Sequence, residues 1–399
     1  MLPIPHFGRA VRRACLSGLV GAMLAGGVAA VAQDADLPPV RGGPVPDFLL
    51  WTQPQREVGF RNMDRLFPTV PVKRGASIHP LPKAEKELAV RYEQFGQTMD
   101  VASYMEKNHV SGLMILHDGK VVLERYRAGF SADQRWTSFS VAKSVTSTLV
   151  GAAIRDGYIK SIDDPVTRYI PQMKGGSYDR VSIRHLMMMA SGIRWDENVE
   201  DFQSDYMRLF HDDFIAPMMD RPQDHAAGTH FLYNTADTNL LGTLVMQATG
   251  KSLSAYLSEK IWAPYGMEQD AAWLTVHGKE TGGACISMRL RDYARFGEFI
   301  RNGAMIDGRP VVADGWLGQA TKRQIDTGWG DVGYGYQWWI NSDGAYRALG
   351  VFGQLIYVDP SRKLVVVGVA AWEHADRQEG YVLENAFLAA VQKSVDGMR

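Results

Sequence analysis

A serine followed three positions later by a lysine, Ser140-Val141-Ala142-Lys143, occurs once in the 399 residues of this chain. Residues three apart on a helix share one face, so Lys143 would lie one turn from Ser140, within reach of its hydroxyl oxygen. A serine hydroxyl is a weak nucleophile and needs an adjacent base of this kind. The spacing therefore predicts a helix that carries a nucleophile in its first turn.

The residues around this motif favour a helix that begins at Thr137 or Ser138 and ends before Gly157. Serine and threonine are preferred N-caps, and the apolar positions that follow recur at helical spacing; they are Val141, Val145, Leu149, Val150, Ala153 and Ile154. Free backbone N–H groups in the first turn would stabilise an anion beside Ser140. An ordinary helix start with a capping serine and a solvated lysine remains the alternative.

Composition and charge are those of a globular protein, and the sequence has no signal for nucleic-acid, metal or nucleotide binding. Hydrophobic residues make up 46% of the chain, charged residues 22%, and the formal net charge is −1. A near-neutral chain of this kind is not expected to bind nucleic acid. The ten histidines form no paired metal-ligand pattern, and neither Gly-x-Ser-x-Gly nor a glycine-rich phosphate loop occurs. We therefore expect no metal and no organic cofactor.

Residues 1–32 have the order of a secretory signal peptide: arginines, a small-residue-rich apolar segment, and an Ala-Val-Ala cleavage site that ends at Ala32. We expect cleavage before Gln33 and a periplasmic or secreted mature protein with no stable membrane span. A retained membrane anchor is the alternative. Cleavage removes one of the two cysteines, so Cys285 is expected to be a small buried side chain without an intrachain disulfide.

The rest of the chain divides into a Pro-rich N-terminal extension, residues 33–105, and a main domain, residues 106–399. Asp118-Gly119 between two apolar runs predicts a β-hairpin, and a helical, loop-rich insertion is expected over about 160–280. The elements expected after it are helices at 287–300 and 383–395 and strands at 351–358 and 364–370. Strands near both ends of the domain, with helices between them, predict a sheet built from N- and C-terminal segments and a helical insertion.

Three motifs follow one another along the main domain: Phe139–Ser144, Leu232–Thr235, and Leu349–Gln354 at the start of a predicted strand. They resemble, in this order, the Ser-x-x-Lys, Tyr-x-Asn and usual Lys-Thr-Gly motifs of the serine β-lactamase and penicillin-binding-protein superfamily. The resemblance extends from roughly residue 112 to the C-terminus. Within the superfamily it points to the class C-like branch of 6-aminohexanoate-dimer hydrolase and family VIII-type esterases. It implies a β-lactamase-like α/β (α+β) fold, with an antiparallel sheet flanked by helices and a helical second region.

The resemblance also implies roles for individual residues. Ser140 would form an acyl-enzyme, with Lys143 and Tyr233 as a proton network and the backbone N–H groups of Ser140 and Val351 as the oxyanion hole. Gly350 and Thr235 would contact the substrate. The ammonium group of Lys143 is expected to lower the pKa of Tyr233. Taken singly, Tyr233 is also explained as a core tyrosine, and Gly350 as a strand glycine at a bulge.

Two departures from the family pattern bear on the substrate. Asn234 takes the first position after Tyr233, and Thr235 stands at the second. Ala348 replaces the lysine that ordinarily faces the carboxylate of β-lactams and peptidyl termini, with Arg347 beside it. We therefore expect a small-molecule ester or linear amide substrate. A β-lactamase or DD-peptidase is one alternative, and a catalytically silent ligand-binding protein is another; the oligomeric state is left open.

Two further segments have simple interpretations. The aromatic run at 329–339 is expected in the core and at the rim of the domain. The acidic residues at 196–201, among them Glu197 and Glu200, are expected to form a solvated loop. If that loop lined the cleft, it would favour the cationic end of a substrate.

Overall fold

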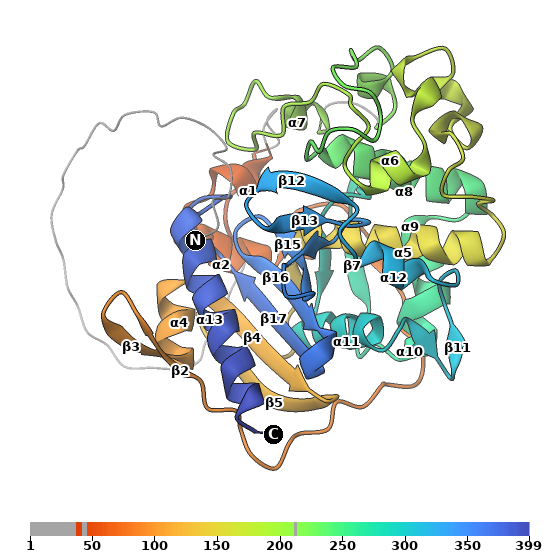
Figure 1. The fold of residues 1–399 in the computed structure, drawn as a ribbon. Helices are drawn as coiled ribbons and strands as arrows, with labels where there is room; N and C mark the ends of the chain where they lie inside the picture. Colours follow the sequence, from red (N-terminus) through yellow and green to blue (C-terminus); the bar gives the residue numbers. More distant parts are fainter. Residues whose placement is uncertain (1–36, 42–45, 211–213, 399) are drawn as a thin grey trace, which may run out of the picture.

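The computed structural model describes residues 37–41, 46–210 and 214–398, and its largest element is an antiparallel sheet of eight strands (Figure 1). In spatial order the strands are β12 (Ile325–Trp329), β13 (Val332–Tyr334), β14 (Trp339–Ile340), β15 (Tyr346–Gly350), β16 (Gln354–Asp359), β17 (Leu364–Ala370), β4 (Val110–His117) and β5 (Lys120–Tyr126). Because β17 pairs with β4, the two ends of the main domain meet in one sheet. The predicted antiparallel sheet is confirmed.

Successive side chains of β17 point to opposite faces of the sheet, as the strand geometry requires. Val365 and Val367 pack into the larger hydrophobic core together with residues of α11 (Leu290–Arg301). Leu364 and Val366 pack into a second core with residues of α13 (Gln378–Asp396). Every residue of β17 is buried, so both faces of the sheet are covered.

A second sheet joins the N-terminal part of the chain to the segment that precedes Ser140. Its strands are β1 (Thr69–Val72), β7 (Ala271–Val276), β9 (Ile286–Met288) and β6 (Trp136–Thr137), with β8 (Lys279–Glu280) paired to β7. Upstream of β1 lie three short helices, α1 (Asp47–Leu50), α2 (Gln53–Phe60) and α3 (Met63–Leu66). Phe48, Trp51 and Phe60 from this region are buried in the larger core. The segment from α1 to β1 is thus packed against the body.

The helical region and the remaining elements follow the predicted order. They are α4 (Val101–Lys107), η2 (Phe139–Val141), α5 (Ala142–Arg155), η3 (Val166–Arg168), η4 (Pro171–Met173), η5 (Ser177–Arg180), α6 (Ile183–Met187), α7 (Asp205–Arg208), η6 (Ala216–Met218), α8 (Thr235–Thr249), α9 (Leu253–Leu257), η7 (Ser258–Trp262), α10 (Ala263–Tyr265), β10 (Met305–Ile306), β11 (Arg309–Pro310), α12 (Trp316–Ala320) and η8 (Pro360–Arg362). Asp118 and Gly119 connect β4 and β5 with φ values of 49° and 75°, which confirms the hairpin. The helix expected from residue 287 begins at Leu290, because Ser287 belongs to β9.

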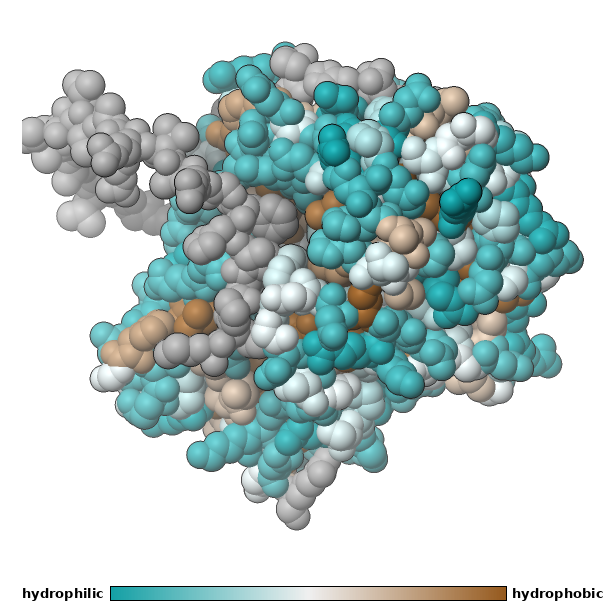
Figure 2. Space-filling model, turned by 45° about the horizontal axis from the view of Figure 1, so that its top comes forward, coloured by the Kyte–Doolittle hydropathy of each residue, from teal (hydrophilic) through white to brown (hydrophobic). Residues whose placement is uncertain are grey.

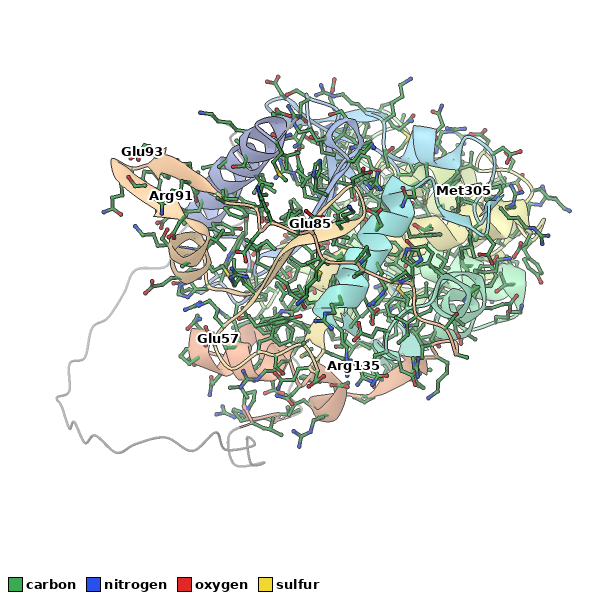
Figure 3. All side chains as sticks on the ribbon, turned by 90° about the horizontal axis from the view of Figure 1, so that it is seen from below. Glu57, Glu85, Arg91, Glu93, Arg135 and Met305 are labelled. Carbon is green, nitrogen blue, oxygen red and sulfur yellow. The ribbon has the colours of Figure 1, made fainter. Side chains whose placement is uncertain are left out.

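The surface is mainly polar. Figure 2 shows one face on which hydrophilic side chains dominate and hydrophobic residues form small separate patches. The hairpin of β2 (Arg91–Gln94) and β3 (Gln97–Asp100) stands out from the body and is marked by Arg91 and Glu93 in Figure 3. Among the described residues, no helix has the length and apolar character required to cross a bilayer. The predicted signal peptide, residues 1–32, lies outside the described residues.

Candidate active site

Ser140 lies in η2, immediately before α5, and lines a pocket beside the large sheet. The predicted N-caps are wrong. Thr137 belongs to β6, and the hydroxyl of Ser138 instead donates to the carbonyl of Phe139 at 3.1 Å and accepts from the N–H of Ile286 at 2.9 Å. These bonds hold the segment before Ser140 against β9. The helix consequently starts at residue 142, after a 3-10 turn that carries the serine.

Lys143 is buried beside Ser140, with 2% of its surface exposed. Its Nζ lies 3.0 Å from the Oγ of Ser140, 2.9 Å from the Oγ1 of Thr235 and 2.8 Å from the carbonyl oxygen of Gly283. The predicted approach of lysine and serine is therefore observed. Burial lowers the pKa of Lys143 to about 8, although the negative charge of Glu197 opposes the shift. At pH 7 roughly one tenth of such an amine is neutral, far more than for a solvated lysine.

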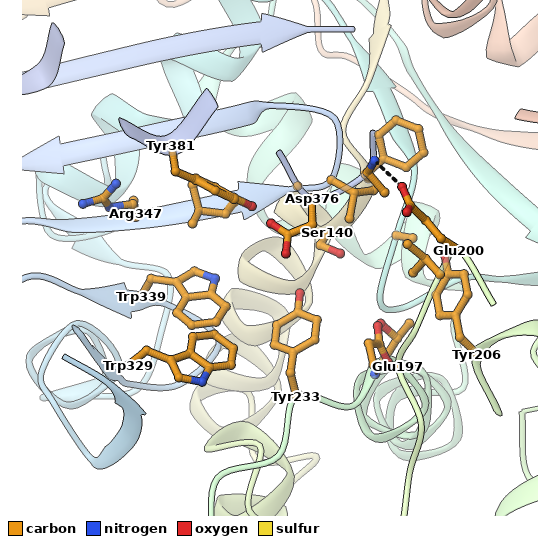
Figure 4. Close-up of a pocket in the computed structure, with 18 of the residues that line it drawn as sticks. Ser140, Glu197, Glu200, Tyr206, Tyr233, Trp329, Trp339, Arg347, Asp376 and Tyr381 are labelled. Atoms are coloured by element: carbon orange, nitrogen blue, oxygen red, sulfur yellow. Dashed lines mark hydrogen bonds between the residues drawn. The ribbon is translucent and has the colours of Figure 1, made fainter. Parts of the chain in front are cut away.

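Tyr233 ends the loop before α8 and points its hydroxyl toward Ser140 (Figure 4). Its ring lies 5.0 Å from Lys143 Nζ and stacks on Trp339 with centroids 5.6 Å apart. The expected lowering of its pKa is wrong. Burial is the largest effect and raises the pKa of Tyr233 well above its usual value, the charge of Glu197 adds to the rise, and a hydrogen bond with Ser140 only partly offsets it. The phenol is therefore protonated.

Thr235 takes the position that asparagine occupies in the family motif. Besides accepting from Lys143, its hydroxyl donates to Glu197 Oε1, and its backbone N–H donates to Glu197 Oε2 at 2.9 Å. The indole of Trp195 also donates to that carboxylate, at 2.5 Å. Asn234 plays a different part, because its Oδ1 caps α8 by accepting from the N–H of Asp237 at 3.1 Å. Asn234 thus caps the helix, and Thr235 contacts the lysine.

Glu197 corrects the expectation of a solvated acidic loop. Only 8% of it is exposed, and burial raises its pKa even though the charge of Lys143 acts in the opposite direction. The burial alternates along this segment: Ile193, Trp195, Glu197 and Val199 are buried, whereas Arg194, Asp196 and Glu200 are exposed. That period of two, with a carboxylate in line with apolar side chains, was the sequence signal for a buried acid.

Gly350 ends β15, and residues 351–353 form the turn to β16. The expectation that Gly350 stands at the start of a strand is wrong, because φ is 63° at Phe352 and 90° at Gly353 and the chain reverses there. A Cβ atom on Gly350 would lie 2.5 Å from the carbonyl oxygen of Ser138. Glycine therefore lets this turn approach the segment that carries Ser140, and Gly350 and Val351 line the same pocket as the serine.

Aromatic side chains form one wall of the pocket. Trp329 stacks on Trp339 with centroids 5.2 Å apart, and Trp339 stacks in turn on Tyr233 (Figure 4). These two tryptophans line the cavity, whereas Trp338 between strands is fully buried. The expectation that the aromatic residues at 329–339 belong to the core and the rim thus holds for Trp338, whereas Trp329 and Trp339 face the site.

Arg347 also lines the pocket, but its guanidinium group is already bound within the protein. Nη1 lies 2.8 Å from Asn385 Oδ1 and 3.4 Å from Glu384 Oε1, and Nη2 and Nε donate to Asn341 Oδ1 at 2.8 and 3.1 Å. Burial raises the pKa of Glu384 to about 7, while the charge of Arg347 opposes the rise. Each guanidinium nitrogen has a partner, so the arginine is not a ready substitute for the missing lysine.

Cys285 is buried behind the site, as predicted, and burial raises the pKa of its thiol to about 12. A thiol of this kind is unreactive at neutral pH. In the part of the chain that the structure describes, no cluster of three or more histidine, cysteine or acidic side chains is arranged to hold a metal ion.

Comparison with known proteins agrees with this geometry. The Beta-lactamase family profile matches residues 100–390. The 6-aminohexanoate-dimer hydrolase of Paenarthrobacter ureafaciens is 29% identical over 374 residues, which span 86% of this chain and 93% of that protein. A Bacillus anthracis protein provisionally named a 6-aminohexanoate-dimer hydrolase has a similar fold, with a TM-score of 0.79 and 22% identity over 89% of this chain and 98% of that one.

A family VIII carboxylesterase shares the fold more distantly, with a TM-score of 0.57 and 16% identity over 72% of this chain and 95% of the esterase. The family profile covers well over half of the chain and includes all three motifs, from the serine to the turn at residues 351–353. The chain belongs to the β-lactamase family of hydrolases.

Proposed function

We propose that this protein is a serine hydrolase that cleaves an ester or a linear amide through an acyl-enzyme on Ser140. The observation that carries the proposal is the setting of Lys143, a buried amine with a pKa of about 8 whose nitrogen lies 3.0 Å from the serine oxygen. A general base works best when its pKa lies near the working pH. A solvated lysine at the usual pKa would be protonated and could not take the serine proton.

In the attack step, neutral Lys143 donates its two hydrogens to Thr235 Oγ1 and the Gly283 carbonyl, which leaves its lone pair for the proton of Ser140. Ser140 Oγ bonds to the substrate carbonyl carbon as that proton moves to Nζ. The carbonyl oxygen becomes an oxyanion, which the backbone N–H groups of Ser140 and Val351 stabilise. Preorganised donors of this kind supply a large part of the rate enhancement of acyl transfer.

Collapse of the tetrahedral intermediate requires a proton on the leaving oxygen or nitrogen. Tyr233 serves as this acid, because its raised pKa keeps the phenol protonated until the leaving group demands the proton. The ammonium of Lys143 then returns a proton to the phenolate. Water enters, loses its proton to the same network, and hydrolyses the acyl-enzyme, so that Ser140, Lys143 and Tyr233 regain their initial states.

The walls of the pocket support this substrate class. Stacked aromatic rings on one side favour an apolar or extended acyl chain, and the carboxylates of Glu200 and Asp376 line the same cavity in addition to Glu197. Such a pocket suits a linear amide that carries an ammonium group, which agrees with the name of the relative from Paenarthrobacter ureafaciens. A short ester with no charge is accommodated by the same aromatic wall.

The deciding experiment is an assay of purified protein, beginning at residue 33, against nitrophenyl butyrate, the linear dimer of 6-aminohexanoate and a chromogenic cephalosporin. We expect turnover of the ester, the amide or both, and covalent labelling of Ser140 by a fluorophosphonate, detected by peptide mass spectrometry. If none of the substrates turns over and Ser140 stays unlabelled, the protein is the catalytically silent binding protein of the alternative.

A further inference from the structure

Each of the two proposed oxyanion donors, Ser140 and Val351, has as one chain neighbour a phenylalanine with a left-handed backbone conformation. Phe139 has φ = 42° and directly precedes Ser140, and Phe352 has φ = 63° and directly follows Val351. Bulky L-residues are rare in this region of backbone space. Such conformations persist where the surrounding structure holds them, and they occur often at functional sites.

Backbone hydrogen bonds hold each of these phenylalanines on one side. The carbonyl oxygen of Phe139 accepts from the N–H of Cys285 at 3.1 Å, and the N–H of Phe352 donates to the carbonyl oxygen of Ala375 at 2.9 Å. The two rings are buried and lie 5.3 Å apart. These bonds anchor each segment to its own neighbour. The two segments are linked to each other by the indole of Trp136, which donates to Gln354 Oε1 at 2.9 Å, and by the packing of the rings.

A third ring bridges them. Phe60, the last residue of α2, lies 4.9 Å from the ring of Phe139 in an edge-to-face arrangement and 5.3 Å from the ring of Phe352. It is fully buried. One turn earlier on α2, the guanidinium of Arg56 lies 4.5 Å over the Phe352 ring and donates to the carbonyl of Trp372 at 3.1 Å. Packed interiors transmit displacements, because their side chains leave few gaps.

The bridging helix lies outside the segment that matches the family profile, residues 100–390. Figure 3 shows Glu57, on α2, at the same edge of the molecule as Arg135, which directly precedes β6 and the Ser140 segment. The N-terminal extension therefore supplies a part to the site that the matched domain does not contain.

We propose that Phe60 is a positioning residue that holds the N–H groups of Ser140 and Val351 in register for the oxyanion, an inference that rests on the proposed function. The Phe60 ring contacts the residue before one donor and the residue after the other. If the ring is lost, the direct contact between the Phe139 and Phe352 rings loses the side chain packed against both of them, and the two N–H groups converge less well on one oxygen. Substrate binding in the aromatic pocket does not depend on that convergence.

The test compares Phe60→Leu with Phe67→Leu. Phe67 belongs to the same aromatic cluster through Phe48 and Trp51, but its ring pairs involve neither Phe139 nor Phe352. We expect Phe60→Leu to lower kcat for a nitrophenyl ester about 10- to 100-fold, with KM changed less than about twofold. Binding of a boronic acid that forms a tetrahedral adduct on Ser140 should weaken in parallel with kcat. Phe67→Leu should leave these quantities near the wild-type values.

Amide hydrogen exchange provides a readout that does not require activity. In Phe60→Leu, exchange should become faster in peptides that cover residues 136–145 and 348–356, and it should not in Phe67→Leu. Unchanged exchange in both peptides, or a kcat equal to that of wild type in an active enzyme, would overturn the inference. An inactive wild-type protein whose exchange nevertheless responds to Phe60→Leu would refute the proposed function and retain the positioning contact.

Discussion

Thr235 accepts a hydrogen bond from Lys143 at 2.9 Å and donates its own hydroxyl hydrogen to Glu197. A hydroxyl has one hydrogen, so the direction of this chain is determined: the hydrogen faces the carboxylate and a lone pair faces the amine. The buried carboxylate thereby orients the amine through the threonine.

Replacement of Thr235 by valine keeps the shape of the side chain and removes the hydroxyl, so Lys143 and Glu197 each lose one of their buried hydrogen-bond partners. An unsatisfied buried polar group costs about 1–3 kcal/mol. If that cost falls on the transition state, kcat/KM for an ester drops roughly 5- to 150-fold. Thr235→Ser retains the hydroxyl and should stay within a few fold of wild type. Equal rates for the valine and serine variants would contradict the role of the hydroxyl.

The pH dependence of kcat/KM should report the titration of Lys143. The neutral amine is the base, so activity rises with pH and levels off above about pH 8, where the lysine is deprotonated. Glu197 raises the pKa of Lys143, while burial lowers it; Tyr233 and Cys285 also face the amine. Glu197→Gln should therefore move the midpoint of the profile to lower pH.

The matched control for this shift is Asp201→Asn, which removes an exposed carboxylate from the same loop. It should leave the midpoint in place. A Glu197→Gln profile that coincides with wild type, or one displaced to higher pH, would be incompatible with the charge coupling described above.

Ser140→Ala should reduce ester turnover by several orders of magnitude, because the members of a nucleophilic unit are costly to lose. The substitution removes one oxygen and should leave circular dichroism and the melting temperature nearly unchanged. Steady-state assay and intact-mass analysis after treatment with a fluorophosphonate are the measurements. Full activity of the alanine variant would exclude the serine mechanism.

Esters and linear amides should be hydrolysed better than β-lactams. Ala348 provides no charge for a β-lactam carboxylate, and the guanidinium of Arg347 is bound to Asn341, Glu384 and Asn385. A missing charge-assisted contact is worth about 1.5–3 kcal/mol, equivalent to a roughly 10- to 150-fold lower kcat/KM. Assays with nitrophenyl butyrate and a chromogenic cephalosporin measure the ratio. A cephalosporin value equal to or above the ester value would restore the β-lactamase alternative.

Export with removal of residues 1–32 predicts a defined N-terminus for the mature protein. If residues 1–32 are a signal peptide, protein recovered from the periplasm or the medium should begin at Gln33 in N-terminal sequencing. Replacement of Ala30 and Ala32 by bulky residues should block cleavage and retain the longer chain. Recovery of only the full-length chain from the cytoplasm would disprove export.

The features that the sequence predicts correctly have local signals. Helical spacing alone places Lys143 beside Ser140, and Asp118-Gly119 directs a tight hairpin because both residues tolerate positive φ. In both cases neighbouring residues contain the necessary information. The antiparallel sheet that joins both ends of the domain is implied by the family resemblance, and the pairing of β17 with β4 confirms it.

The errors concern contacts between distant segments and an unusual backbone state. At Glu197 the charge indicates solvent and outweighs the weaker signal of alternating apolar residues, and the partners that stabilise the buried carboxylate, Thr235 and Trp195, are visible only in the structure. The run from Val351 onward reads as one strand because aromatic residues rarely adopt positive φ; the turn at Phe352 depends on tertiary contacts. The expected pKa of Tyr233 is wrong because burial outweighs a nearby charge.

The pairing of β17 with β4 also determines when the protein becomes functional during its synthesis. Strands β4 and β5, and the helix that carries Lys143, are made early, but their sheet neighbour and the turn with Val351 come from the C-terminal part of the chain. Contacts so far apart in sequence form slowly. Until that part arrives, one edge of β4 is unpaired, which is a known hazard for aggregation, and Ser140 lacks the wall that Gly350 and Val351 form. We therefore expect a nascent chain to complete both its sheet and the proposed site late, when β17 joins β4.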